Sequence, residues 1–147
     1  MSKHESNYYD SYPVGRLGII ALKSYEEIGR QVNDYLLTWR AQRESSLSYN
    51  MEAEGYVRDT FLINTRVPRF GSGEGKGIVD ESIRGDDLYL LVDICNYSIT
   101  YRMNGFSNRM SPDDHFQDLK RTIAAIGGKA RRINFIMPFL YESRQHK

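Results

Sequence analysis

Residues 87–94 read DLYLLVDI, a run that is apolar almost throughout. A strand with one solvated face alternates apolar and polar residues, whereas a strand covered on both faces is almost continuously apolar. The run therefore predicts a central parallel strand. Short apolar or β-branched runs predict further strands at residues 17–21, at residues 60–67 and from Ile133 onward.

A first helix is expected at about residues 24–40. Ser24 followed by Glu27 forms a capping-box pattern at its start. Apolar residues then recur at helical spacing, so they predict a stripe that faces the core. The members of this stripe are Ile28, Val32, Tyr35, Leu36 and Trp39.

A second helix is expected between Ser111 and Gly127. Ser111 is a capping residue, Pro112 suits the first helical position, and Gly127 with Gly128 suits the end. The order strand, helix, strand, strand, helix, strand is typical of right-handed βαβ units. The sequence thus predicts an α/β fold, a three-layer, mainly parallel sheet with helices on both faces.

The chain of 147 residues is expected to form one domain. Residues 1–16 are polar and predict a flexible lead-in, and residues 17–147 a single domain. Residues 41–56 show no periodicity and predict an irregular insertion, and residues 96–110 predict a loop.

Composition argues against several classes of partner. Twenty Lys and Arg against 19 Asp and Glu give a net charge of +1, which supplies no field to attract nucleic acid or anionic lipid. The single cysteine, Cys95, excludes an internal disulfide, and its apolar neighbours favour a core position. No long apolar run or secretion signal is present, so a cytoplasmic protein is expected.

A few charged residues allow a structural or a functional interpretation. His115 is expected at the surface, and Asp113 with Asp114 is explained by the helix dipole. Arg131 and Arg132 would stabilise a helix end or form an anion patch. The glycine-rich residues 70–77 resemble a phosphate cradle, but they lack a P-loop ending, and a mobile hairpin explains them equally well.

Three stretches together resemble a known family. They are FGSGE at residues 70–74, ESIRGDDLY at 81–89 and KARRINFIMPFLYESRQ at 129–145. Their order and spacing are similar to the amino-terminal half of ribose-phosphate pyrophosphokinase, which makes phosphoribosyl pyrophosphate. The resemblance covers residues 17–147, interrupted at residues 41–56 and by extra residues around 101–110.

The resemblance implies a phosphoribosyltransferase-like lobe on the ATP side of the active site. In that family magnesium-ATP donates a diphosphoryl group to ribose 5-phosphate. By position, Phe70, Ser72 and Glu74 would lie on the loop that reaches adenine, often across a subunit boundary. Arg144 and Gln145 would contact the nucleotide and its phosphates, because an arginine fork grips phosphate oxygens bidentately.

The resemblance also implies partners that complete the enzyme. These are ATP, Mg²⁺, ribose 5-phosphate, a carboxyl-terminal lobe and further copies in a homo-oligomer. The metal ligands and catalytic loops of the family would follow Lys147, so no catalytic or metal-binding residue is predicted within residues 1–147. The chain alone is expected to be inactive.

Some positions depart from the family pattern. The family usually has Asp or Asn at Ser72 and Asp at His146, and Gly75 and Gly77 interrupt an expected strand. These departures support an alternative, a non-catalytic nucleotide-binding or regulatory homologue.

Overall fold

The computed structural model describes residues 13–46 and 57–145. Within these ranges, no helix is long and apolar enough to cross a membrane. The elements in chain order are β1 (Leu17–Ala21), the 3₁₀ turn η1 (Lys23–Tyr25), α1 (Glu26–Ser46), β2 (Thr65–Arg66), β3 (Ile78–Val79), β4 (Asp87–Leu91), β5 (Thr100–Met103), β6 (Phe106–Arg109), α2 (Pro112–Ile126) and β7 (Arg132–Ile136).

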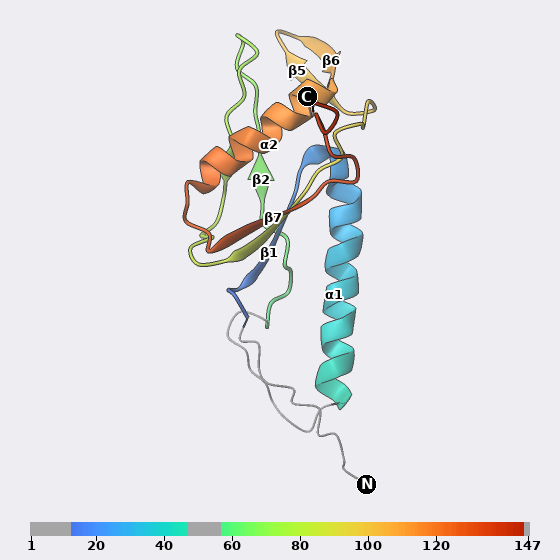
Figure 1. The fold of residues 1–147 in the computed structure, drawn as a ribbon, viewed down its shortest axis with the longest axis vertical. Helices are drawn as coiled ribbons and strands as arrows, with labels where there is room; N and C mark the ends of the chain where they lie inside the picture. The colour runs from blue at the N-terminus through green and yellow to red at the C-terminus, as the bar shows by residue number, and fades with distance from the viewer. Residues whose placement is uncertain (1–12, 47–56, 146–147) are drawn as a thin grey trace.

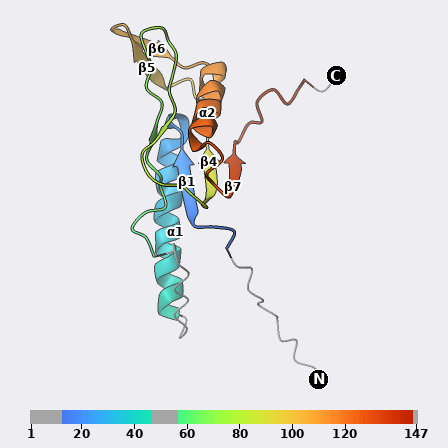
Figure 2. The ribbon, with the colours of Figure 1, turned by 90° about the vertical axis from the view of Figure 1, so that its left-hand side faces the viewer.

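The central element is β4, which lies between β1 and β7 in a three-stranded parallel sheet (Figures 1 and 2). Both neighbours pair with it over five residues, so that Asp87 is opposite Leu17 on one side and Arg132 on the other. Two antiparallel pairs, β2 with β3 and β5 with β6, stand apart from this sheet. The predicted central strand and the parallel pairing are confirmed.

The alternation of side chains along β4 divides the core into two clusters. Leu88 and Leu90 belong to the larger cluster, which α2 joins through Leu119 and Ile126. Leu91 belongs to the smaller cluster, against which α1 places its partly buried leucines. Successive strand residues point to opposite faces of a sheet, and α1 and α2 pack against different clusters of this core.

Two arginine–aspartate pairs close the amino-terminal edge of the sheet. The Arg16 guanidinium donates to both carboxylate oxygens of Asp86, each at 2.9 Å, and Asp86 is 1% exposed. Arg132 donates to both oxygens of Asp87 at 2.8 and 2.5 Å. Arg132 thus holds β7 to β4, and neither the helix-end nor the anion-patch interpretation of this residue is correct.

The first helix is longer than predicted, because α1 continues to Ser46. Residues 41–46, expected in an irregular insertion, are helical, and residues 47–56 lie outside the described residues. The predicted capping box is wrong. The Ser24 hydroxyl accepts a hydrogen bond from the Asp93 amide, and Glu27 pairs with Arg30 and Gln31.

The predicted buried stripe of α1 is also wrong, except for Leu36. Ile28 and Val32 are each 37% exposed, and Tyr35 and Trp39 are 61% and 54% exposed. The helix packs on the sheet through the partly buried Leu36 and Leu37 and through small and polar residues. Gly29 lies against Ala21. The side-chain oxygen of Asn33 accepts a hydrogen bond from the backbone amide of Phe61 at 2.8 Å.

Two other segments differ from expectation. Residues 60–67 follow β1 through a single parallel bridge, Ile19 with Leu62, and only Thr65–Arg66 is a regular strand. The predicted loop at 96–110 contains the hairpin β5–β6, whose turn has Asn104 and Gly105 at positive φ. Asn-Gly flanked by extended residues is a strong hairpin signal.

The structure confirms the second helix and corrects the position of the cysteine. Ser111 and Asp114 form a capping box, and Gly127 closes α2 in the left-handed conformation. Cys95 is exposed, because β4 ends at Leu91 and the Asp93 carboxylate accepts the Cys95 amide in the turn that follows.

The segment from β2 to β3 forms an arm that lies against α2, and Gly77 is at the point of contact. A Cβ atom at Gly77 would be 2.2 Å from the carbonyl oxygen of Arg121. A side chain at this position would therefore push the arm away from the helix backbone.

We predict that Gly77→Ala lowers the free energy of unfolding by about 1–3 kcal/mol, because overpacking forces the backbone apart. Urea unfolding measures this loss. Gly71→Ala is the control, because its nearest neighbour is a side-chain oxygen of Asn104 at 3.2 Å, which can shift. Equal losses in the two variants would contradict the packing argument.

We further predict that Asp87→Asn lowers the free energy of unfolding at neutral pH by about 1–2 kcal/mol. This loss is smaller than expected for a fully buried ion pair, because the Arg132 side chain is partly exposed. Hydrogen bonds from Arg132 hold the pKa of Asp87 below its ordinary value of 3.8. The stabilisation is thus present above that value and is lost as pH falls through the lowered pKa.

The measurement is the difference in unfolding free energy between wild type and Asp87→Asn at several pH values. It should shrink in acid. Asp80→Asn, which breaks the more exposed pair with Arg66, should cost less at neutral pH. A difference that grows as the pH falls would show that the pair does not act as described.

Candidate functional site

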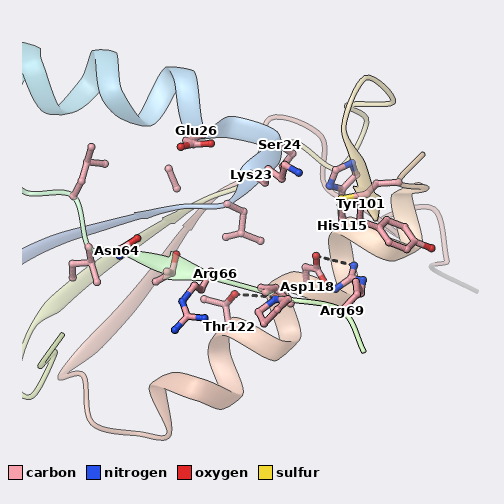
Figure 3. A pocket seen from close by; sticks show the side chains of 18 of the residues that line it. Lys23, Ser24, Glu26, Asn64, Arg66, Arg69, Tyr101, His115, Asp118 and Thr122 are labelled. Atoms are coloured by element: carbon pink, nitrogen blue, oxygen red, sulfur yellow. Dashed lines mark hydrogen bonds and ion pairs between the residues drawn. The ribbon is translucent and has the colours of Figure 1, made fainter. Parts of the chain in front are cut away.

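A cavity of about 610 Å³ lies between the carboxyl end of β1, the start of α1, the arm and α2 (Figure 3). Its wall contains an unusual number of buried polar side chains, namely Ser24, His115, Asp118 and Thr122. Lys23, Glu26, Arg30 and Arg66 also line it, and the two arginines are paired with Glu26 and Asp80. Buried polar groups are costly unless they are paired, so each needs a partner.

The centre of the polar wall is an ion pair between the arm and α2. Arg69 donates to both carboxylate oxygens of Asp118 at 2.6 and 2.9 Å, and its side chain is only 3% exposed. The guanidinium carbon also lies 4.9 Å from the centre of the Tyr101 ring. Arg121 donates to the same carboxylate at 2.8 Å.

His115 is 2% exposed, so its predicted surface position is wrong. Its Nε2 lies 2.8 Å from the backbone oxygen of Asn96, and because a carbonyl only accepts, Nε2 carries a proton. Asn96 in turn donates to the backbone oxygen of Ser24. His115 and Asn96 therefore link α2 to η1, which precedes α1.

The predicted adenine loop, residues 70–74, is a tight turn at the tip of the arm. The Phe70 amide donates a hydrogen bond to the backbone oxygen of Glu74 at 2.8 Å, and Gly73 has a positive φ. The Ser72 hydroxyl donates to the Glu74 carboxylate at 3.0 Å. The Phe70 ring is 54% exposed and therefore has a free face.

The hairpin β5–β6 supports this loop. The Asn104 amide nitrogen donates to the Gly71 carbonyl oxygen at 3.1 Å, and the Met103 sulfur lies close to Gly73. Both contacts come from the tip of the hairpin, which Figure 1 shows beside the arm. The extra residues around 101–110 thus contact the loop that the sequence associates with the base.

The second predicted group, Arg144 with Gln145, follows β7 in a turn that α2 anchors. The Tyr141 hydroxyl donates to the Asp113 carboxylate, and this bond raises the pKa of Tyr141 to about 12. The centres of the Tyr141 and Phe116 rings are 5.3 Å apart. Arg144 and Gln145 are exposed, and the Arg144 guanidinium has no bonding partner among the described residues.

The structure does not bring the two predicted groups together in one chain. Figure 2 shows the segment after β7 running away from the arm and the hairpin β5–β6. Both segments contact α2, the arm through Asp118 and the segment after β7 through Asp113 and Phe116.

Metal-binding groups are sparse in the part of the chain that the structure describes. Within residues 13–46 and 57–145, no three His, Cys, Asp or Glu side chains are grouped so as to hold a metal ion. Among the described residues near the cavity and the loop, Asp118 is engaged by Arg69 and Arg121, Glu26 by Arg30, and Glu74 by Ser72.

Sequence reasoning missed the polar wall of the cavity and the support of the loop. The Asn-Gly dipeptide at 104–105 was a usable signal for the hairpin. The pairing of Arg69 with Asp118 has no local signal, because the two residues are 49 positions apart.

We predict that Asn104→Asp loosens loop 70–74. Aspartate tolerates the left-handed backbone of position 104 but cannot donate to the Gly71 carbonyl. Hydrogen exchange should become faster at the loop amides, with little change in global stability. Asn108→Asp is the control, because it adds the same charge to the same hairpin but its amide contacts only Phe106. Equal acceleration in both variants would refute a specific support.

The comparison with curated proteins gave no match. Residues 17–147 match the family described as the N-terminal domain of ribose phosphate pyrophosphokinase. This match spans every strand, both helices, the loop 70–74 and the turn that carries Arg144. The chain therefore belongs to the N-terminal domain family of ribose phosphate pyrophosphokinase.

Proposed function

We propose that this chain is the ATP-side lobe of a ribose-phosphate diphosphokinase, a phosphoribosyltransferase-like lobe of three layers. In the complete enzyme, diphosphate passes from ATP to ribose 5-phosphate, and phosphoribosyl pyrophosphate is formed for nucleotide biosynthesis. The observation that carries the proposal is the family match over residues 17–147, which includes both predicted nucleotide-binding segments.

The geometry of Arg144 supports a role in phosphate binding. Its side chain is exposed on a turn that Tyr141 anchors to α2. Among the described residues, no carboxylate forms an ion pair with it. A planar fork of this kind binds two phosphate oxygens at once, which a lysine ammonium does not. Transfer of a phosphoryl-type group depends mainly on positioning and charge neutralisation, so such a contact would contribute to rate and to binding.

Phe70 and Glu74 would form the base-recognition side of the site. An exposed aromatic ring can stack on a purine, and Glu74 accepts a hydrogen bond from Ser72 while keeping a second carboxylate oxygen for the adenine amino group. Because the segment after β7 runs away from the arm in Figure 2, we propose that loop 70–74 of one copy completes the site of another copy in a homo-oligomer.

The described residues do not fit a magnesium site, since no suitable group of acidic or histidine side chains is present within them. We assign no residue of this chain to the metal. Mg²⁺ is commonly held through substrate phosphates, and we expect it to reach the site on ATP.

A non-catalytic nucleotide-binding or regulatory role is the second candidate. The observation that favours it is Ser72, where the family usually has Asp or Asn. The exposed Ser72 hydroxyl donates to the Glu74 carboxylate, and serine has neither the carboxylate nor the amide of the usual residue.

We predict weak ATP binding by the isolated chain, because a site completed by other segments loses preorganisation. Arg144→Ala should weaken binding at least about tenfold, in line with the loss of charge-assisted hydrogen bonds. Arg131→Ala is the matched control, since this exposed arginine lies at the opposite end of β7. Calorimetry that gives submicromolar affinity, or equal losses in the two variants, would contradict the assignment.

Enzyme assays separate the two candidate functions. The isolated chain should release no AMP from ATP and ribose 5-phosphate, and clear turnover would refute a single-lobe role. Combined with a second lobe of the family, the chain should support AMP release. Retained ATP binding without turnover in that combination would favour the regulatory homologue.

A further inference from the structure

The outer face of α1 carries large apolar side chains that are exposed to solvent. Four large apolar side chains lie on it with exposures of 37–61%: Ile28, Val32, Tyr35 and Trp39. The Tyr35 and Trp39 ring centres are 5.2 Å apart, so the aromatic half of this surface is continuous. An exposed contiguous apolar patch is a frequent sign of a protein contact.

The spacing of these residues indicates what kind of element covers them. Positions 28, 32, 35 and 39 follow steps of four, three and four residues, which is the a/d spacing of a coiled-coil seam. Such a seam is complementary to another helix that runs nearly parallel or antiparallel to it. Helix α1 has 21 residues and extends well beyond the sheet, so a second helix has access to it (Figure 1).

We propose that α1 is a self-association surface, on which α1 of a second copy of this chain packs in antiparallel orientation about a two-fold axis. The steps of four, three and four residues are the same in both chain directions. A two-fold axis that passes between Val32 and Tyr35 therefore places the seam of one copy on the seam of the other. A two-fold interface requires this self-complementarity. The inference does not depend on the proposed function.

Side-chain size favours the antiparallel orientation. The first half of the seam is aliphatic, with Ile28 and Val32, and the second half is aromatic, with Tyr35 and Trp39. The antiparallel arrangement places Ile28 of one copy against Trp39 of the other, and Val32 against Tyr35. Large side chains then meet smaller ones and interdigitate, whereas parallel helices would place the two Trp39 rings at the same level.

Charge favours the same orientation. Residues 26–34 of α1 carry three carboxylates and one guanidinium, whereas residues 35–46 carry two guanidinia and one carboxylate. Antiparallel helices bring the acidic half of each copy beside the basic half of the other, and they also oppose the two helix dipoles. The flanking residues Gln31 and Thr38 are uncharged and exposed, so like charges do not meet beside the seam.

Trp39 is the only tryptophan of the sequence, so its fluorescence reports directly on this surface. Sedimentation of the full chain should show a dimer at high concentration, and dilution should convert it to monomer with a red shift of the Trp39 emission. A monomer at every concentration would overturn the proposal. A monomer with shielded Trp39 would assign the surface to a segment of the same chain and would overturn it as well.

Val32→Glu places a charge in the seam and should weaken dimerisation at least about tenfold. Ala41→Glu adds the same charge to an exposed position on another side of α1 and should leave the dimer intact. Thermal unfolding verifies that both variants are folded. An unchanged dimer in Val32→Glu would assign association to another surface and reject the proposal.

Disulfide trapping tests the orientation independently, in a Cys95→Ser background that removes the natural thiol. A mixture of Ile28→Cys and Trp39→Cys chains should form a mixed disulfide on oxidation, and Trp39→Cys alone should not. Efficient cross-linking of Trp39→Cys with itself would indicate parallel helices and overturn the antiparallel arrangement.

Discussion

The position of β4 between two parallel neighbours is the constraint on which the other elements depend. Its apolar residues face both clusters of the core, and the bonds of Asp86 and Asp87 with Arg16 and Arg132 fix where β1 and β7 begin. Once these three strands are in register, their carboxyl ends lie at one edge. The connections that leave this edge then carry the cavity and the turn with Arg144.

The sequence was most informative where local chemistry and burial agree. A continuous apolar run has few alternatives to a central strand, and Ser111, Pro112 and Gly127 bound α2 as caps do in isolated helices. The family resemblance located the loop 70–74 and the turn at 144–145. It did not indicate how they are arranged in one chain, because both segments are positioned by contacts with α2.

The expected buried face of α1 was wrong for a physical reason. Periodicity reveals that a helix has an apolar stripe, but it does not say which partner covers the stripe. Here the contact with the sheet uses Gly29, which permits a close approach, and Asn33, which satisfies the Phe61 amide. These contacts orient the helix and leave its most apolar side outward. His115 and Arg69 escaped prediction because their partners come from distant segments.

Helix α2 supports both segments that the sequence connects with the nucleotide. Its middle contacts the arm through Asp118 and Arg121, and its first turns contact the turn after β7 through Asp113 and Phe116. A single rigid rod therefore sets the distance between the loop and Arg144. In an assembly where each site takes its loop from another copy, a tilt of α2 at one site would displace a wall of the next. In such an assembly, the geometry of neighbouring sites would be linked through this helix.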